Sequence, residues 1–234
     1  MRSRVKRLAC ALILVCLSMS SIADSVILLH GLARSDWSMA KIEKALTREG
    51  YCVQNINYDS TRKNIETLAE EAIGPALEAC PDEARVHFVT HSLGGILVRQ
   101  YLQHQQIGNL GRVVMLGPPN KGSEVVDNLR DFPGFHFFHG DAGLELGTGE
   151  TSVPNRLGHA NFDLGIIAGT RSINILLSRM IPGVDDGKVS VENTRLPGMS
   201  DHLEMDVTHT FMMRDDKVIE QVIHYLQQGR FKRE

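Results

Sequence analysis

The sequence predicts an α/β protein whose central sheet is mostly parallel and carries helices on both faces. Short apolar runs recur along the chain, and amphipathic helical segments separate them. Turn residues are scattered rather than gathered into a linker. Strands that alternate with helices through short turns are typical of a parallel sheet covered on both faces. The 234 residues suffice for one compact domain, which we place at residues 24–234.

The predicted elements follow one another as repeated strand and helix units. Each strand is a short apolar or β-branched run, and each helix has apolar residues three and four positions apart. The strands are predicted at 25–29, 51–58, 85–90, 112–119 and 162–169, and the helices at 35–50, 65–77, 92–103 and 217–229. Gly74-Pro75 lies within the second helix and predicts a kink or an early end there.

Residues 1–23 have the pattern of a signal peptide. Four basic residues precede an apolar run of a dozen residues, and Ser21-Ile22-Ala23 provides a small-x-small cleavage signal. The apolar run is shorter than the roughly 20 residues that cross a bilayer. We therefore expect an exported protein, periplasmic or secreted, with no stable membrane span after cleavage.

The charge of the chain disfavours nucleic acid as a partner. Loss of the leader removes four basic residues and no acidic ones, which leaves 21 Lys+Arg (25 − 4) against 28 Asp+Glu and a formal charge of −7.

The histidines and cysteines lack metal-ligand spacing, so no metal site is expected. The sequence does not indicate an oligomeric state.

Two cysteines remain after the leader, and they predict a disulfide bridge. Cys52 begins a predicted strand, and Cys80 lies between a helix end and the next strand. Both therefore fall at the N-terminal edge of a parallel sheet, where they could meet, and export compartments preserve disulfides. Two free thiols are the alternative. A bridge there would lie opposite the edge at which such sheets bind ligands.

The segment THSLGG, residues 90–95, predicts a nucleophile at Ser92. It lies between a predicted strand and a predicted helix, which is the setting of a nucleophile elbow. The turn lifts the serine above the sheet edge and directs a helix N-terminus toward developing negative charge. Thr90 stands where the usual G-x-S-x-G pattern has its first glycine. A serine that only caps the helix is the alternative.

Acyl transfer also needs an oxyanion site, a base and an acid. His30-Gly31-Leu32 follows the first predicted strand, so the backbone N–H groups of Leu32 and Leu93 are the expected oxyanion donors. In this class of fold the acid and then the histidine follow the serine along the chain. Further residues are candidates for these two roles: Asp186, with Asp185 as the alternative acid, and His209, with His202 as a rival base that could instead be structural.

With these residues in place, the chain resembles the lipase-like branch of the α/β-hydrolase superfamily, including bacterial triacylglycerol lipases and GPI-inositol-deacylase-like hydrolases. The resemblance covers nearly all of residues 24–234. It rests on LLHGLARS (28–35), NYDS (57–60), HFVTHSLGG (87–95), VVMLGPPNKGSE (113–124), DDGKVS (185–190) and VTHTFMM (207–213).

This resemblance implies an α/β-hydrolase fold and a hydrolase without a cofactor. Several bacterial lipases carry the acid in an Asn-Asp-Gly-x-Val loop, which residues 185–189 resemble with Asp in place of Asn, and this supports Asp186. It also implies Leu32 and Leu93 as oxyanion donors. The calcium bound by some relatives is not carried over, because no matching second Asp follows His209.

Residues 121–160 form a long irregular stretch and predict a short lid-like insertion. Half of the eight phenylalanines gather there within seven positions, beside Gly and Pro: Phe132, Phe135, Phe137 and Phe138. This composition fits an apolar flap that binds an acyl group, and it fits equally a loop packed over the core.

Together these features predict a serine hydrolase that cleaves carboxylic esters, of a small molecule or a lipid, through a Ser-His-Asp triad and an acyl-enzyme. The same triad also serves thioesterases, amidases and acyltransferases, which the sequence does not separate. A non-catalytic binding protein that retains the fold is the remaining alternative.

Overall fold

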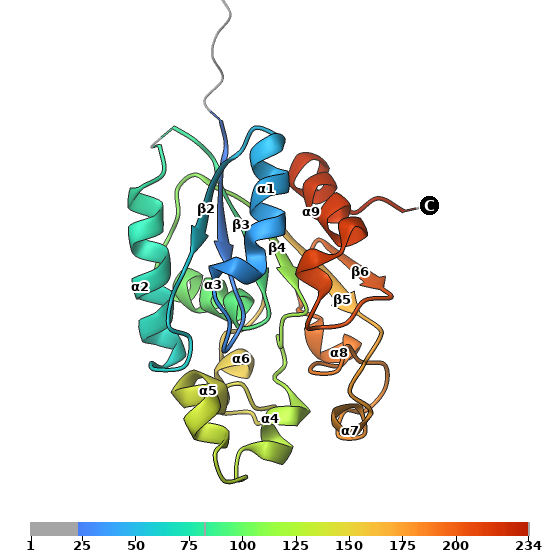
Figure 1. The fold of residues 1–234 in the computed structure, drawn as a ribbon. Coiled ribbons are helices and arrows are strands. Elements are labelled where there is room, and N and C mark those ends of the chain that lie inside the picture. Colours follow the sequence, from blue (N-terminus) through green and yellow to red (C-terminus); the bar gives the residue numbers. More distant parts are fainter. Residues whose placement is uncertain (1–22, 82, 234) are drawn as a thin grey trace, which may run out of the picture.

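A six-stranded sheet lies between two layers of helices in the computed structural model, which describes residues 23–81 and 83–233 (Figure 1). Apart from Ala23, the predicted signal peptide lies outside the described residues. All strands pair in parallel, in the spatial order β2-β1-β3-β4-β5-β6. Their bounds are β1 (Ser25–Leu29), β2 (Cys52–Ile56), β3 (Val86–His91), β4 (Leu110–Leu116), β5 (Leu164–Gly169) and β6 (Asp201–Met205). The predicted α/β class is confirmed.

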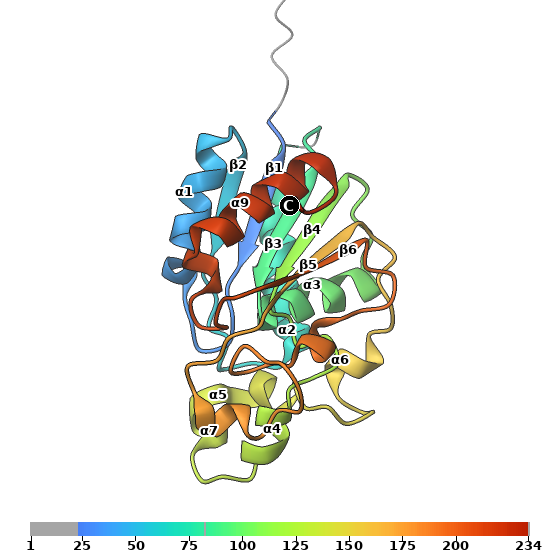
Figure 2. The same cartoon turned by 90° about the vertical axis from the view of Figure 1, so that its right-hand side faces the viewer.

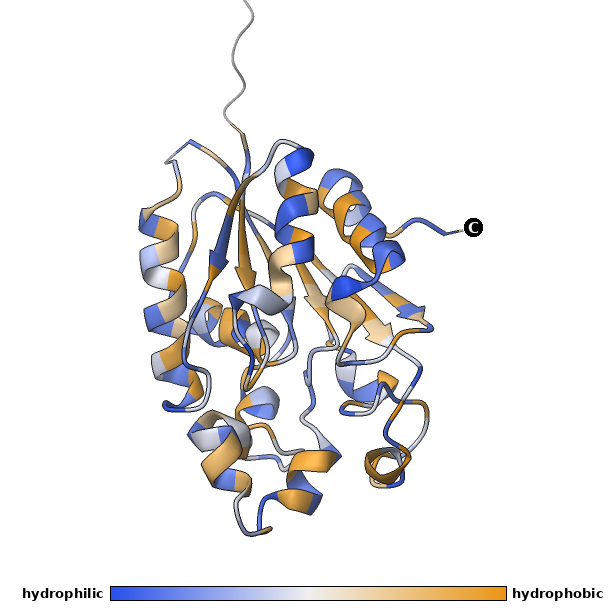
Figure 3. Cartoon of the chain, in the orientation of Figure 1, coloured by the Kyte–Doolittle hydropathy of each residue, from blue (hydrophilic) through white to orange (hydrophobic). Residues whose placement is uncertain are grey.

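Each face of the sheet has its own hydrophobic core. In β1, Ile27 and Leu29 contribute to one core, and Val26 and Leu28 contribute to the other. Figure 2 shows α1 and α9 together on one side of the sheet, and Figure 3 shows that both helices alternate hydrophobic and hydrophilic residues. The first core is covered by α2 (Ile65–Glu78) and α3 (Leu93–His104), and the second by α1 (Ala40–Arg48) and α9 (Asp216–Gln228).

Several elements were not predicted from the sequence. The strand β6 is at the sheet edge and is half-buried or exposed, so its sequence DHLEM has no apolar run to reveal it. Pro75 does not break α2 but lies inside its last turn. The first turn of the helix predicted at 35–50 is a separate 3-10 helix, η1 (Asp36–Met39). The other unpredicted elements are α4 (Glu124–Leu129), α5 (Phe135–Leu144), α6 (Val153–Arg156), α7 (Ile175–Ser178), α8 (Val191–Thr194) and η2 (Met212–Arg214). Across residues 23–81 and 83–233, every helix is too short or too polar to traverse a bilayer.

The predicted disulfide between Cys52 and Cys80 is wrong for this structure, because both residues are free thiols. The Cys80 sulfur is buried, accepts a hydrogen bond from Gln54 Nε2 at 2.9 Å and donates to the Ala76 carbonyl at 3.4 Å. Cys52 is exposed at the start of β2. The shared sheet edge brings the two residues into one region, but the buried thiol is occupied by other partners.

A buried arginine connects the insertion to the sheet. Arg99 lies on α3 with 4 % of its surface exposed, and burial lowers its pKa to about 10. Its guanidinium donates to the backbone carbonyls of Asn120, Pro154 and Gly158 and to Asn120 Oδ1, at 2.9–3.1 Å. Asn120 precedes the insertion and the other two lie near its end, so one side chain fixes both ends of residues 121–160.

We predict that Arg99→Met lowers the free energy of unfolding by about 3 kcal/mol, because several buried carbonyls then lose their donor. Urea denaturation followed by circular dichroism measures this change. Arg48→Met is the matched control, since Arg48 is exposed on α1, and it should change stability by less than about 0.5 kcal/mol. Equal midpoints for the two variants would contradict the anchoring role of Arg99.

Candidate active site

Ser92 lies at a sharp turn between β3 and α3. Its backbone has φ +52° and ψ −118°, a region that side-chain-bearing residues rarely occupy. The turn is held where Ser92 N–H donates to the Leu116 carbonyl of β4 at 2.9 Å. Ser92 is the N-cap residue of α3, yet its side chain makes no capping hydrogen bond. Capping therefore does not explain this serine, and the strain matches a nucleophile elbow.

The elbow depends on close approach between α3 and β1, and Gly94 permits it. A Cβ atom at Gly94 would lie 2.6 Å from the Leu29 carbonyl oxygen. Thr90, which replaces the usual first glycine, lies fully buried within β3 on the same strand face as Phe88. Its hydroxyl has no hydrogen-bond partner among the described residues. The fold thus accepts a β-branched residue here at the expense of an unpaired polar atom.

Asp186 and His209 form a buried hydrogen-bonded pair beside Ser92. His209 Nδ1 lies 2.7 Å from Asp186 Oδ2, and the two side chains are 8 % and 0 % exposed. Because a carboxylate only accepts, Nδ1 carries the proton and Nε2 keeps its lone pair. Asp186 Oδ1 accepts from the backbone N–H groups of Lys188 and Val189. Gly117 leaves room for the pair, since a Cβ there would lie 3.0 Å from Asp186 Oδ2.

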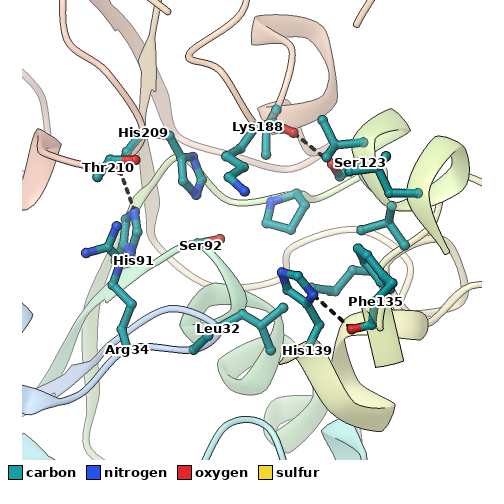
Figure 4. Close-up of a pocket in the computed structure, with 17 residues that line it drawn as sticks. Leu32, Arg34, His91, Ser92, Ser123, Phe135, His139, Lys188, His209 and Thr210 are labelled. Atoms are coloured by element: carbon teal, nitrogen blue, oxygen red, sulfur yellow. Dashed lines mark hydrogen bonds between the residues drawn. The ribbon is translucent and has the colours of Figure 1, made fainter. Parts of the chain in front are cut away.

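Ser92 and His209 line one pocket but are not hydrogen-bonded to each other within the described residues (Figure 4). The Ser92 hydroxyl can rotate among its staggered positions, whereas His209 is fixed by Asp186. Contacts of this kind are often long or poorly aligned without substrate and tighten in the reacting complex. The structure therefore brings the three predicted residues to one site with the serine not yet engaged.

The rival residues have structural partners. Asp185 Oδ1 accepts from Ser178 Oγ at 2.8 Å and from Gly187 N–H at 2.7 Å, so this carboxylate holds its own loop. His202 lies on β6, and its Nε2 is 2.9 Å from Thr194 Oγ1. Burial, and then the charge of Arg195, lower the pKa of His202 to about 4, so it is neutral near pH 7.

His91, next to Ser92, holds the backbone of His209. Its Nε2 lies 3.0 Å from the His209 carbonyl oxygen, and since that oxygen only accepts, Nε2 carries the proton. Its Nδ1 is buried without a partner among the described residues. Burial, the charge that His209 can carry and Arg34 lower the pKa of His91 well below its usual range, so the ring stays neutral.

The loop with the expected oxyanion donor Leu32 is held from the neighbouring strand. Ala33, at φ +52°, donates its N–H to Ser60 Oγ at 2.9 Å. The Tyr58 hydroxyl donates to the His30 carbonyl, and the two rings stack with centroids 4.0 Å apart. The NYDS segment thus supports this loop. Leu93 is the first residue of α3, whose opening N–H groups lack partners within the helix.

The pocket above Ser92 has an apolar wall supplied by the insertion. Its volume is about 260 Å³, near the lower end of the usual range for ligand pockets. Among the four predicted phenylalanines, only Phe135 is buried and lines this pocket. Phe132, Phe137 and Phe138 are 66–84 % exposed on the outer surface. The rest of the apolar wall comes from Val125, Val126, Leu129 and Leu146.

Three further polar side chains line the same pocket, and the sequence patterns did not identify them. Arg34 comes from the loop after β1, Lys188 from the loop that carries Asp186, and His139 from α5. His139 Nδ1 donates to the Phe135 carbonyl at 3.0 Å, which leaves Nε2 as an acceptor. Figure 4 shows Lys188 extending into the pocket toward Ser92. The described part of the chain contains no group of three or more His, Cys, Asp or Glu placed to hold a metal.

Comparison with known proteins assigns the family. The Alpha/beta hydrolase family model matches residues 26–223, so the chain belongs to the alpha/beta hydrolase family. No curated protein matches the chain in sequence. The mature form of Bacillus licheniformis lipase BlEst2 shares 18 % identity with a TM-score of 0.71, and the match covers 88 % of this chain and 92 % of that one.

Other solved structures share the fold at similar distance. Phospholipase PlaB from Legionella pneumophila has 19 % identity and a TM-score of 0.57, with 75 % of this chain and 45 % of that chain covered. A metagenomic carboxyl esterase has 17 % identity and a TM-score of 0.65, with 81 % and 65 % covered. At these identities the likeness establishes the fold, which agrees with the resemblance noted from the sequence.

We predict that Thr90→Val leaves the free energy of unfolding unchanged or raises it by about 1 kcal/mol, because valine has nearly the same shape without the unpaired hydroxyl. Urea denaturation checks this result, with Thr47→Val on the exposed surface of α1 as the control. A loss of more than about 1 kcal/mol would show that the Thr90 hydroxyl makes a favourable interaction.

Proposed function

We propose that the chain is a serine hydrolase that cleaves carboxylic esters, with Ser92 as nucleophile, His209 as base and Asp186 as the acid that orients it. The observation that carries this proposal is the strained, uncapped Ser92 in one pocket with a histidine whose Nδ1–H is fixed by a buried carboxylate. The lipase and esterase names of the structural neighbours agree with the proposal.

The proposed reaction has two halves. The Ser92 oxygen attacks the ester carbonyl while His209 Nε2 accepts the serine proton, and the imidazolium is stabilised by Asp186. The N–H groups of Leu32 and Leu93 donate to the oxyanion. The imidazolium then protonates the departing alcohol, which leaves an acyl-enzyme. Water, deprotonated by His209, releases the acid and restores the serine.

We further propose that the protein is exported, since residues 1–23 have the pattern of a cleaved leader.

We also propose that the insertion at 121–160 acts as an acyl-binding flap through Phe135 and its aliphatic neighbours. The modest pocket volume supports esters with short or medium acyl groups. A series of para-nitrophenyl esters and thioesters of rising chain length tests both the acyl preference and the bond cleaved.

We predict that a fluorophosphonate probe labels the folded protein at a single site and that Ser92→Ala abolishes the labelling, because the probe reacts with activated serines. Gel fluorescence and peptide mass spectrometry measure this outcome. Ser123→Ala is the matched control, since Ser123 lines the same pocket but is bonded to the Lys188 carbonyl. Labelling that survives Ser92→Ala would reject the nucleophile, and so would no labelling of folded protein.

We predict that Asp186→Asn lowers kcat by about 10³-fold to 10⁴-fold, since an amide no longer fixes the proton on His209 Nδ1. Asp185→Asn, at the adjacent position, is the matched control. It should retain kcat within about threefold, because its carboxylate contacts only its own loop. Steady-state kinetics on a para-nitrophenyl ester separates the two. The reverse order of effects would assign the acid to Asp185.

A further inference from the structure

Two cations in the pocket, Lys188 and Arg34, have no counter-ion of their own. Within the described residues, neither side chain makes an ion pair or a hydrogen bond with another group, although both are half-buried. Most other lysines and arginines of the chain with comparable exposure are paired, as Lys121 is with Glu192 and Arg195 with Glu204. Burying an unpaired cation away from water costs folding free energy unless a bound anion neutralises its charge.

The surroundings of the two cations increase this cost. Burial lowers the pKa of Lys188, Arg34 lowers it further, and Asp186 raises it. Burial and the charge of Arg214 lower the pKa of Arg34. Asp186 cannot serve as a dedicated partner for Lys188, because its two oxygens already accept from His209 and from two backbone N–H groups. The pocket mouth is therefore locally cationic in a chain whose formal net charge is −3.

The backbone of Lys188 is fixed on both sides. Its N–H donates to Asp186 Oδ1 at 3.0 Å, and its carbonyl accepts from Ser123 Oγ at 2.7 Å. The first contact ties the lysine to the triad acid, and the second ties it to the residue that precedes α4. These contacts fix the backbone from which the side chain starts, and Figure 4 shows the side chain extending from it into the pocket toward Ser92.

From this arrangement we infer that Lys188 forms an anion-binding subsite beside Ser92, with Arg34 adding positive charge beside His91, and that the substrate is an ester carrying a carboxylate or phosphate near the scissile bond. The inference rests on the proposed ester hydrolysis and specifies its substrate class. The apolar wall takes the acyl chain, while Lys188 holds the anionic group through a charge-assisted hydrogen bond and Arg34 contributes positive charge from beside His91. The ligand is thus an anionic amphiphile rather than a neutral ester.

The test compares matched anionic and neutral esters. In the first pair, mono-para-nitrophenyl glutarate carries a negative charge on its acyl group and para-nitrophenyl valerate is its neutral counterpart. In the second pair, monooctanoylglycerol phosphate carries the charge on its alcohol group and monooctanoylglycerol is the neutral counterpart. We expect the wild-type protein to favour the anionic member of at least one pair by about ten-fold in kcat/KM. Lys188→Met should lower that anionic-to-neutral ratio about ten-fold, Arg34→Met should lower it by a smaller factor because its charge acts from beside His91, and Lys188→Glu should invert it.

The control variant is Lys44→Met, which removes the same charge from the exposed face of α1 and should leave the ratio unchanged. Inorganic phosphate is added as an inhibitor to identify the source of the anion. Competitive inhibition that Lys188→Met removes would show that the subsite binds free phosphate. A preference for the anionic ester without inhibition by phosphate would show that the subsite binds an anionic group on the ester. A wild-type ratio near one in both pairs overturns the inference. Equal losses on both members in Lys188→Met also overturn it, since the lysine would then only position Asp186.

Failure of this inference is distinguishable from failure of the proposed function. Fluorophosphonate labelling of Ser92 is independent of the charge on the ester substrates. A protein that is labelled at Ser92 and hydrolyses both members of each pair equally retains the ester hydrolase function and loses the anion subsite. A folded protein that is not labelled loses the function, and the subsite assignment with it.

Discussion

The strained turn at Ser92 is the constraint on which the arrangement of the site depends. The chain must leave β3 and enter α3 within one residue, and it does so with φ +52° at a residue that carries a side chain. Such a conformation persists only where its surroundings impose it. Here they are the Leu116 carbonyl that holds the Ser92 N–H and the contact of Gly94 with β1.

The parallel sheet then gathers the remaining groups at the same edge. The loops after β1 and β3 bring Leu32 and Ser92 together, and the loops after β5 and β6 bring Asp186 and His209. These segments are far apart in sequence, but parallel strands end side by side. The loops at the sheet edge thus supply Ser92, His209 and both cations, whereas the insertion supplies most of the apolar wall together with His139 and Ser123. Reactivity and acyl binding therefore come from different parts of the chain.

The sequence predicted the parts of the molecule that rest on strong local patterns. The strands β1, β3, β4 and β5 carry buried apolar runs and were recognisable, β2 was recognisable from Val53 and Ile56 although it is a half-exposed edge strand, and the elbow has a distinctive setting around Ser92. The edge strand β6 was missed because one polar, half-exposed strand lacks periodicity. Lys188 and Arg34 were missed because a single cation has no signature, and only tertiary contacts show that it lacks a partner. The bridge between Cys52 and Cys80 failed because proximity to one sheet edge does not fix side-chain partners.

Arg99 fixes the points at which the insertion leaves and rejoins the core. One guanidinium holds the residue before the segment and two residues near its end, so the segment leaves and re-enters the core at nearly one point. Because loop-closure entropy varies only slowly with length, changes in the length of the segment between these anchors cost little entropy. A different segment between the same anchors would change the apolar wall of the pocket, but it would have to keep the contacts of Ser123 with the Lys188 carbonyl and of Glu145 with the Ile65 N–H.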